Sequence, residues 1–382
     1  TARAINTDSE QLRTFNFLSI ATEVIANSRR LKKVHFTDSE FNPYSSIDIP
    51  EEDKLGWPPT LLFYQPELET IIRSNNLKYK NLKILENTEA VNIESTDPIQ
   101  VDIRNNRKDS PIYCKYLIGC DGANSFVRKY IKAKLVDFGF DQDWIVIDAH
   151  TTKQIDISKD EAKQICDPNR LKTYVPGRRN HKRFEFKLLK RETKKDFTKK
   201  KVWELLSPWI NKNNSKIERA VVYKFHACIA DKWRDKNIFI AGDAAHQMPP
   251  FLGAGMGTGI RDVFNLAWKI FLVIRGKADE KLLETYQLER EPHANWTIQQ
   301  AKIIGEMMEQ YSYREKGEKY VPSNTGYGEV FPHLTNGYYG DPSDGLIATP
   351  FCRFNLDGSK KDSDGYFGWN FGLISKKKLT KE

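Results

Sequence analysis

The chain has 382 residues, of which 39% are hydrophobic and 12% aromatic, so it is not a disordered protein and is long enough for two or three domains with their own cores. The formal net charge of +9 comes from 60 basic and 51 acidic residues, with lysine-rich runs at 190–201 and at the C-terminus. Neither run alternates basic with aromatic residues, so we expect solvated surfaces and no nucleic-acid partner.

The longest apolar run, 266–274, contains Lys269 and is too short to cross a bilayer, so no membrane span is expected. The chain starts with Thr1 and shows neither the charged nor the apolar region of a secretory signal. Its five cysteines are scattered and form no CxxC pair, which argues against a disulfide scaffold and against a metal site. We therefore expect a reducing compartment and a cytoplasmic location.

In chain order, the first 104 residues alternate helix and strand. Apolar residues on one side predict a helix over 7–29, and short strands follow within 33–64. A helix is predicted over 65–75, with Pro66 in its first turn. The segments 82–96 and 99–103 alternate as two further strands.

The middle of the chain, from 141 to 228, is predicted to be mostly β-structure. It includes a hairpin turn at 177–182, a lysine-rich helix around 194–211 and a long strand over 218–230. Helices return after 257, at 259–276 and 279–291, and the tail beyond 320 is weakly patterned. This order predicts an α/β (α+β) fold in which β-rich insertions interrupt an α/β domain twice.

The stretch YLIGCDGANSFVRKYI at 116–131 predicts a buried parallel strand, a tight turn at Asp121-Gly122 and a helix capped by Ser125. In open α/β sheets, ligands bind outside the carboxyl ends of the strands. The residues alone leave two interpretations open: a ligand-binding loop and an ordinary strand-to-helix junction.

The stretch IFIAGDAAHQMPPFLGAGMGTG at 238–259 places Gly242 and Asp243 at the end of a second buried strand. A carboxylate there can accept two hydrogen bonds from a diol, and the following glycines let the backbone approach a flat ligand. The next helix would direct its N-terminal amides at developing negative charge. No Gly-Lys-Ser/Thr follows, so a nucleoside triphosphate site is not expected. His246 has no second His or acidic partner at ligand spacing, which favours a structural histidine over a metal ligand.

Together, CDGANSFVR and FIAGDAAHQMPPFLGAGMGTGIRDVFNLAWKI resemble the two downstream flavin motifs of the FAD-dependent aromatic hydroxylases of the para-hydroxybenzoate hydroxylase type. Within that family, GWPPTLLFYQPELE, YVPGRRNHKRFEF, KFHACIADKWR and LLETYQLEREPH resemble the 3-(3-hydroxyphenyl)propionate hydroxylase group. The resemblance covers roughly residues 1 to 310. It implies a Rossmann-like FAD-binding domain interleaved with a β-rich substrate domain.

The resemblance also implies domain boundaries. The discontinuous FAD-binding domain would comprise 1–32, 63–140 and 229–318, and the substrate domain 33–62 and 141–228. Residues 319–382 would form a C-terminal extension, because related enzymes often continue into a thioredoxin-like region that is mostly missing here.

The family's cofactor-binding positions match Arg3, Gln65, Asp121, Gly122, Gly242, Asp243, Pro250, Gly253, Gly255, Met256 and Gly257. By similarity, Asp243 would hold the ribityl chain of FAD. The amides near Met256 and Gly257 would stabilise negative charge on the reduced flavin pyrimidine. Asp121 and Gly122 would support the pyrophosphate side and influence NAD(P)H use.

Two of the matched positions, Arg3 and Gln65, lie early in the chain. Arg3 and Gln65 would lie beside FAD, and Arg128 matches an arginine that closes the Asp-Gly motif, with a structural salt bridge as the alternative. Arg178, Arg179 or Arg183 could pair with a substrate carboxylate, although solvated arginines at a hairpin edge are the interpretation we favour.

The implied reaction is hydroxylation of a small phenolic substrate by O2, with FAD as cofactor and NAD(P)H as co-substrate. Which phenol is used, whether NADH or NADPH is used, and which side chain helps to ionise the phenol do not follow from the sequence. The catalytic residues are therefore unknown, and the oligomeric state is left open, with a homodimer as one option.

One family feature is not found: the G-x-G-x-x-G of an initial βαβ unit, which seats the ADP half of FAD. We expect the chain to be a fragment of an ordinary hydroxylase, with a naturally truncated form as the alternative. Two other functions are kept: an FAD-deficient remnant of such an enzyme, and another flavoenzyme on the same scaffold. The Trp-x-Trp-x-Ile motif of flavin-dependent halogenases is not found.

Overall fold

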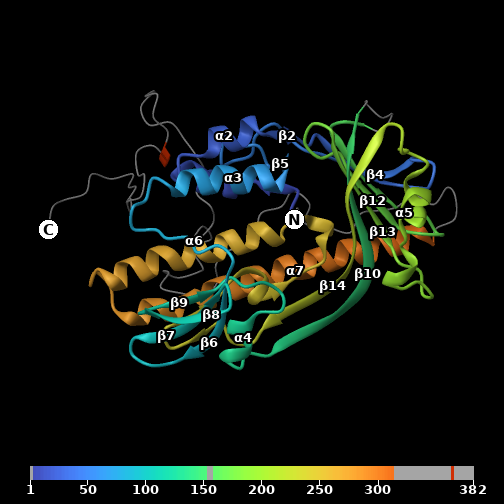
Figure 1. Ribbon diagram of the computed structural model, residues 1–382. Helices are drawn as coiled ribbons and strands as arrows, with labels where there is room; N and C mark the ends of the chain where they lie inside the picture. Colours follow the sequence, from blue (N-terminus) through green and yellow to red (C-terminus); the bar gives the residue numbers. More distant parts are fainter. Residues whose placement is uncertain (1–2, 153–157, 314–362, 365–382) are drawn as a thin grey trace.

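The computed structural model describes residues 3–152, 158–313 and 363–364, and the predicted C-terminal extension lies almost entirely outside them (Figure 1). The seven α-helices of this part are α1 Ser9–Phe17, α2 Ala21–Ala26, α3 Gln65–Asn76, α4 Phe126–Tyr130, α5 Lys199–Leu206, α6 Gly255–Ile274 and α7 Thr285–Ser312. Its strands form four sheets.

A small antiparallel sheet lies nearest the N-terminus. Its order is β1-β5-β2, with β1 at Asn6–Asp8, β5 at Thr60–Phe63 and β2 at Ser28–Arg30. Helices α1, α2 and α3 pack with it around one core cluster, which Met256 and Ile260 of α6 also join. Helix α3 begins at Gln65 with Pro66 in its first turn, as predicted.

The single helix predicted over 7–29 is wrong. The chain leaves helical geometry at Ser19, whose φ of 60° is left-handed, and restarts as α2 before forming β2. The predicted helix over 194–211 is likewise shorter. A 3₁₀ turn at Lys194–Asp196 comes first, and Thr198 then caps α5 by accepting a hydrogen bond from the Lys201 amide at 3.4 Å.

The largest sheet has eight strands in the order β17-β14-β10-β13-β12-β11-β3-β4. Their bounds are β17 His246–Gln247, β14 Ser215–Ala230, β10 Leu135–Thr151, β13 His181–Lys187, β12 Lys172–Val175, β11 Glu161–Ile165, β3 Lys33–Thr37 and β4 Pro43–Asp48. Figure 1 shows β10 and β14 as long curved strands that connect this sheet with the lower part of the molecule. Segments 33–48 and 161–187, far apart in sequence, thus share one sheet.

A third sheet brings the two motif strands together. Its order is β15-β16-β9, with β15 at Arg234–Asp235, β16 at Ile238–Ile240 and β9 at Leu117–Gly119. The fourth sheet is the meander β6 Thr88–Glu94, β7 Ile99–Asn105 and β8 Lys108–Cys114. The strand predicted from residue 82 begins only at Thr88, and β8 was not predicted, because most of its residues are solvent-exposed and carry no hydrophobic alternation.

Helices α6 and α7 run side by side through the middle of the molecule (Figure 1). The main hydrophobic core joins them to β9, β14 and β16, and each fully buried large side chain in it, such as Trp233 or Tyr286, contributes about 1.5–3 kcal/mol. Lys269 is buried in this interface, where it pairs with Glu289 at 2.6 Å and donates a hydrogen bond to Thr285. No helix in the described part of the chain is long and apolar enough to span a membrane.

Candidate active site

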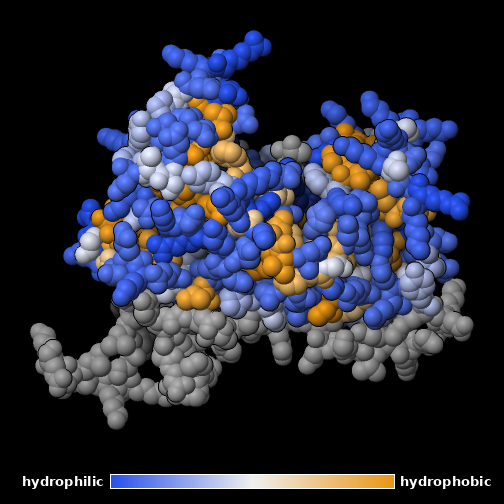
Figure 2. Space-filling model, turned by 90° about the horizontal axis from the view of Figure 1, so that it is seen from below, coloured by the Kyte–Doolittle hydropathy of each residue, from blue (hydrophilic) through white to orange (hydrophobic). Residues whose placement is uncertain are grey.

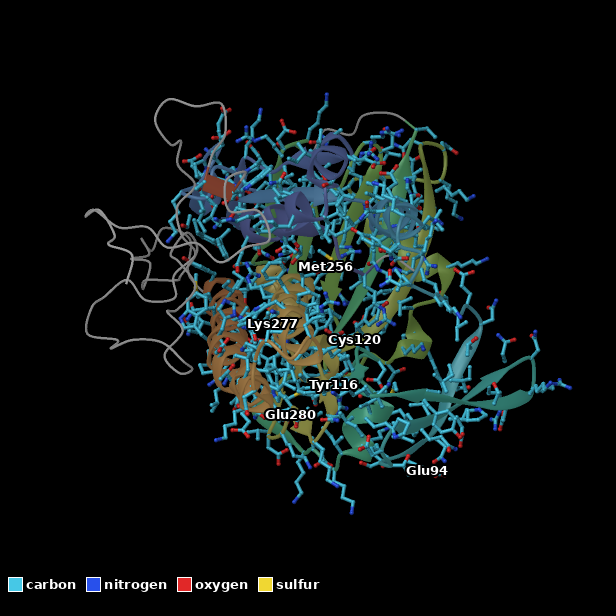
Figure 3. The ribbon with its side chains drawn as sticks, turned by 90° about the vertical axis from the view of Figure 1, so that its left-hand side faces the viewer. Glu94, Tyr116, Cys120, Met256, Lys277 and Glu280 are labelled. Carbon is cyan, nitrogen blue, oxygen red and sulfur yellow. The ribbon has the colours of Figure 1, made fainter. Side chains whose placement is uncertain are left out.

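The two motifs lie beside each other. Strand β16 pairs in parallel with β9 over Ile238–Leu117 to Ile240–Gly119, so both strands end at the same sheet edge. In Figure 3, Cys120, which follows β9, lies closer to Met256 at the start of α6 than Tyr116, which precedes β9. Both motif loops therefore leave the sheet at one carboxyl edge, which is where ligands bind in open α/β sheets.

In the first motif, Asp121 caps the following helix. Its carboxylate accepts hydrogen bonds from the Ser125 hydroxyl at 2.5 Å and from the Phe126 and Val127 amides at 2.6 and 3.0 Å. Ser125 in turn accepts from the Arg128 amide at 2.8 Å, as the predicted N-cap should. The carboxylate of Asp121 thus orders the loop.

Arg128 is buried and joins the two motifs. Its guanidinium donates hydrogen bonds to the carbonyl oxygens of Ala244 at 2.9 Å and Ala123 at 2.6 Å. The structural role weighed for this residue is therefore present, with carbonyl acceptors in place of a carboxylate.

In the second motif, Asp243 is exposed at the end of β16. No hydrogen bond or ion pair of its carboxylate is found within the described part of the chain. The chain then passes through Pro249 and a 3₁₀ turn at Pro250–Leu252, and the left-handed Gly253, with φ 66°, ends that turn just before α6. Asp243 is consequently free to accept hydrogen bonds from a bound molecule.

The glycines near the start of α6 have different environments. A Cβ on Gly253 would lie 2.3 Å from the Asn6 side chain, and one on Gly257 would lie 2.0 Å from Nε2 of Gln11. A Cβ on Gly255 would meet only Met248, at 3.9 Å. Close packing against the N-terminal segment therefore requires the first two glycines, while Gly255 borders open space.

His246 is buried and structural, as favoured from the sequence, but it does have an acidic partner. Its Nε2 lies 2.6 Å from Asp262, which also accepts hydrogen bonds from the Gly242 amide at 3.0 Å and from Arg290 at 2.9 Å. This partner was not visible as a nearby residue in the sequence, because Asp262 lies sixteen residues later, on the face of α6 that packs under this loop.

A cavity of about 480 Å³ opens beside Asp243 and the first turn of α6. Its walls come from the N-terminal segment, the 248–256 segment and strands β3, β5, β11, β12 and β13. An adjoining cavity of about 230 Å³ extends along β14 and touches Ala123 of the first motif.

Seven of the predicted cofactor residues border these cavities: Arg3, Gln65, Asp243, Pro250, Gly253, Gly255 and Met256. The other four, which are Asp121, Gly122, Gly242 and Gly257, lie outside the cavity walls: the first three belong to the supporting loops, and Gly257 lies in α6. Gln65 also orders the N-terminal segment, since its Oε1 accepts hydrogen bonds from the Ala4 amide at 2.8 Å and the Arg3 amide at 2.5 Å.

The arginines of the 177–183 hairpin differ from the solvated edge that we favoured. Only Arg179 is exposed; Arg178 and Arg183 are 6% and 4% exposed. Arg178 binds Asn27 and Glu67, while Arg183 reaches Asp148 at 2.8 Å and the Arg3 carbonyl at 2.6 Å. They are buried because the hairpin packs against the N-terminal layer, a contact that local sequence does not reveal.

Asp148, at the centre of this region, is fully buried and was not singled out from the sequence. It accepts hydrogen bonds from His181 at 3.0 Å, from Arg183 and from Arg219. Burial alone would raise its pKa, but the His181 hydrogen bond and the Arg183 charge outweigh burial and lower the pKa well below its usual range.

Glu185 was also missed, although the sequence carries a signal for it. In HKRFEFK, the residues Phe184 and Phe186 alternate with Arg183 and Glu185. The two phenylalanines pack in the α5 cluster, so the polar pair must point to the opposite face, where both residues border the two cavities.

The residues around the cavities fit FAD. The larger cavity is bordered by the Asp243 carboxylate, which makes no hydrogen bond to a described residue, and by the first-turn amides of the twenty-residue helix α6. Beside Gly255 the cavity is open. The first amides of a helix have no intrahelical partner and favour negative charge. Asp243, Gly255 and Met256 are the residues best placed to hold such a cofactor.

Comparison with known proteins agrees with this geometry. Residues 1–301 match the family model described as FAD binding domain. A probable NADH-specific resorcinol 4-hydroxylase of Rhodococcus jostii (strain RHA1) is 32% identical over 308 residues, covering 79% of this chain and 58% of that protein. A 3-(3-hydroxy-phenyl)propionate/3-hydroxycinnamic acid hydroxylase of Escherichia coli (strain K12) is 31% identical over 312 residues, 80% of this chain and 55% of that protein.

The chain thus spans a little more than half the length of these relatives. Among solved structures, aklavinone-11 hydroxylase with FAD and aklavinone superposes with a TM-score of 0.75 at 19% identity, covering 91% of this chain and 69% of that one. A p-nitrophenol 4-monooxygenase from Pseudomonas putida DLL-E4 gives 0.72 at 18% identity, covering 81% and 80%. At this identity the likeness concerns the fold, and it confirms the predicted α/β class.

Proposed function

The chain belongs to the FAD-binding domain family, and we propose that it forms the catalytic part of an FAD-dependent monooxygenase that hydroxylates a phenolic compound with NAD(P)H and O2. The observation that carries the proposal is the pairing of the two motif strands, which sets Asp243 and the start of α6 beside one large cavity. The names of the relatives in Rhodococcus jostii and Escherichia coli support a phenolic substrate, and the former supports NADH as the reductant.

In this proposal, Asp243 accepts hydrogen bonds from the ribityl hydroxyls of FAD, and the amides of Met256 and Gly257 face its pyrimidine ring. The first-turn amides of α6 would stabilise negative charge there. When bound, FAD supplies hydride acceptance from NAD(P)H and activation of O2. The chain's own share is to hold cofactor and phenol together, exclude water and handle the phenolic proton.

The apolar part of the cavity wall supports a place for the aromatic ring. It includes Leu62, Ala162 and Val175, which come from three different strands. We assign 33–62 and 141–228 to the substrate domain and 1–32, 63–140 and 229–318 to the FAD-binding domain. Strands β10 and β14 cross the boundaries of this division.

We also place the protein in the cytoplasm, because the four cysteines within the described residues are free thiols, which suits a reducing compartment. A homodimer remains a prediction, which light scattering of the purified protein would test.

The test is reconstitution of the purified chain with FAD, followed by NADH oxidation with and without resorcinol. We expect a yellow protein, resorcinol-stimulated NADH oxidation, matching O2 uptake and a hydroxylated product. Failure to take up FAD would contradict the proposal and favour an FAD-deficient remnant. FAD uptake with NADH oxidation but no hydroxylated product would favour another flavoenzyme on this scaffold.

A further inference from the structure

Glu185 is a buried carboxyl group in the cavity wall. It lies on β13 and is 6% exposed, and it borders both the larger and the smaller cavity. Its two neighbours along the strand, Phe184 and Phe186, belong to the core on the other face. Strand β13 therefore places one carboxyl group in the wall of the larger cavity, which is otherwise largely apolar.

The residues beside Glu185 on the neighbouring strands are polar as well. Glu185 faces Thr173 across the β13–β12 pair, and Thr173 faces Gln164 across the β12–β11 pair. All three border the larger cavity, and the Thr173 hydroxyl donates a hydrogen bond to Oε1 of Gln164 at 2.6 Å. The Thr173 hydroxyl thus donates to Gln164 and not to Glu185, whose carboxyl can accept from a ligand.

The two arginines beside Glu185 are held in other contacts. Arg183, two residues away on the same strand, and Arg219 on β14 both donate to Asp148 of β10, Arg219 through Nε at 3.0 Å. Arg3 and Asp243 are the other charged residues that share both cavities with Glu185. Within the described residues, no hydrogen bond to the Glu185 carboxyl is found.

We propose that Glu185 accepts the proton of the phenolic hydroxyl of the substrate, which makes it a catalytic residue of the monooxygenase proposed above. This inference rests on that proposed function. In the step, the phenol O–H bond breaks, its electron pair stays on the phenol oxygen, and the proton bonds to a carboxylate oxygen of Glu185. The pair keeps one negative charge throughout, and the step consumes no oxidant or reductant.

The surroundings of Glu185 suit this role. Burial raises its pKa to about 7, with the Arg183 charge opposing the rise and the Asp148 charge adding to it. A base whose pKa lies near the working pH transfers protons most effectively, and a positioned base contributes about 10²–10⁴-fold to a rate. The phenol becomes more acidic as its ring is oxidised, so a base of this strength is sufficient.

The kinetic test compares Glu185→Gln with wild type and with Glu218→Gln. The control makes the same change at an exposed glutamate of β14 that contacts Tyr64 and His150 and borders neither cavity. In wild type, product formation should rise as pH increases through about 7, because only the carboxylate can accept a proton. In E185Q we expect about a 100-fold loss of hydroxylated product at pH 8 and a flat pH profile. Glu185→Asp should restore the pH dependence at a reduced rate.

A second measurement needs neither FAD nor turnover. Infrared spectra recorded across pH should show a protonated carboxyl C=O band that appears as the pH falls through about 7 in wild type and in E218Q, but not in E185Q. If wild type and E185Q titrate alike in that range, or if E185Q keeps the wild-type pH profile, the assignment of Glu185 is wrong. Absence of hydroxylation in wild type would instead overturn the proposed function, which the infrared result does not depend on.

Discussion

Single residues near the cavity show how the fold manages buried charge. Asp148 is fully buried, and the three groups that bind it, His181, Arg183 and Arg219, come from β13 and β14 on either side of β10. Burial of such a cluster costs desolvation free energy. Removal of one member nevertheless destabilises the protein strongly, because the remaining buried charges lose their partner. Asp148 therefore fixes Arg183 at the cavity wall as well as holding the sheet together.

Replacement of Asp148 by Asn should lower the free energy of unfolding by about 3–5 kcal/mol at pH 7, since two buried guanidinium groups lose their counter-charge. Urea denaturation would measure the loss. The folded pKa of Asp148 lies below its unfolded value of about 3.9, so its contribution is present above that pH and is lost as the pH falls through the folded pKa. The difference between D148N and wild type should therefore shrink at low pH.

Asp109→Asn provides the control, because Asp109 pairs with Arg104 at 2.7 Å on the surface, where both side chains are about half exposed. We expect a much smaller loss of stability from it, because an exposed ion pair contributes little. An equal effect of the two substitutions would show that the buried cluster has no special part in stability.

At the scale of elements, the first turn of α6 packs against helix α1 on one side and borders the cavity on the other. Gly257 faces Gln11 of α1, whose Nε2 donates to Asp8 at 2.7 Å, whereas Gly255 faces the cavity. The same glycine-rich sequence thus joins two helices on one side and leaves room for a ligand on the other.

Gly257→Ala and Gly255→Ala should have opposite effects on stability. The methyl group of G257A would displace the buried Gln11 and cost about 1–3 kcal/mol. In G255A the methyl group has space, and the better helix propensity of Ala should add about 0.5–1 kcal/mol, while the narrower cavity should weaken FAD binding. Thermal unfolding and FAD titration of both variants check this; tighter FAD binding by G255A would contradict it.

The elements also show what local sequence can predict. Helix α6 and strand β14 were predicted because each carries a long, consistent apolar pattern, and the site at the end of β16 was predicted because Gly and Asp follow a buried strand. The break at Ser19 was not predicted, since its left-handed backbone is set by packing among α1, α2 and α3. Strand β8 lacks the pattern because it is stabilised by pairing with β7 alone.

For the whole molecule, the pairing of strands that lie far apart in the chain could not be predicted from the sequence. One wall of the cavity is formed by a single continuous segment, from Asp243 to Met256, so its residues could be predicted from the sequence. The opposite wall comes from strands separated by more than a hundred residues, as in the pairing of β3 with β11. Glu185 faces the cavity only because of that arrangement, so no local motif could identify its partners. Seen from below, the surface is mostly hydrophilic with separate hydrophobic patches, which gives no further guide to the site (Figure 2).

Binding of FAD should stabilise the whole molecule by mass action. A ligand present at one hundred times its Kd adds about 2.7 kcal/mol to the free energy of unfolding. Asp243→Ala should leave the FAD-free protein as stable as wild type, because the side chain is exposed and no described residue bonds to it, but it should reduce the increment at the same FAD concentration. Each tenfold loss of affinity removes about 1.4 kcal/mol.

Denaturation of wild type, D243A and the control Asp235→Ala, each with and without FAD, would separate the two effects. Asp235 is exposed on β15 and borders neither cavity, so D235A should keep the full increment. A full increment in D243A would mean that FAD does not contact this carboxylate. A loss of stability without FAD would mean instead that Asp243 supports the loop, as Asp121 supports its own, because a purely ligand-binding carboxylate has nothing to stabilise until FAD arrives.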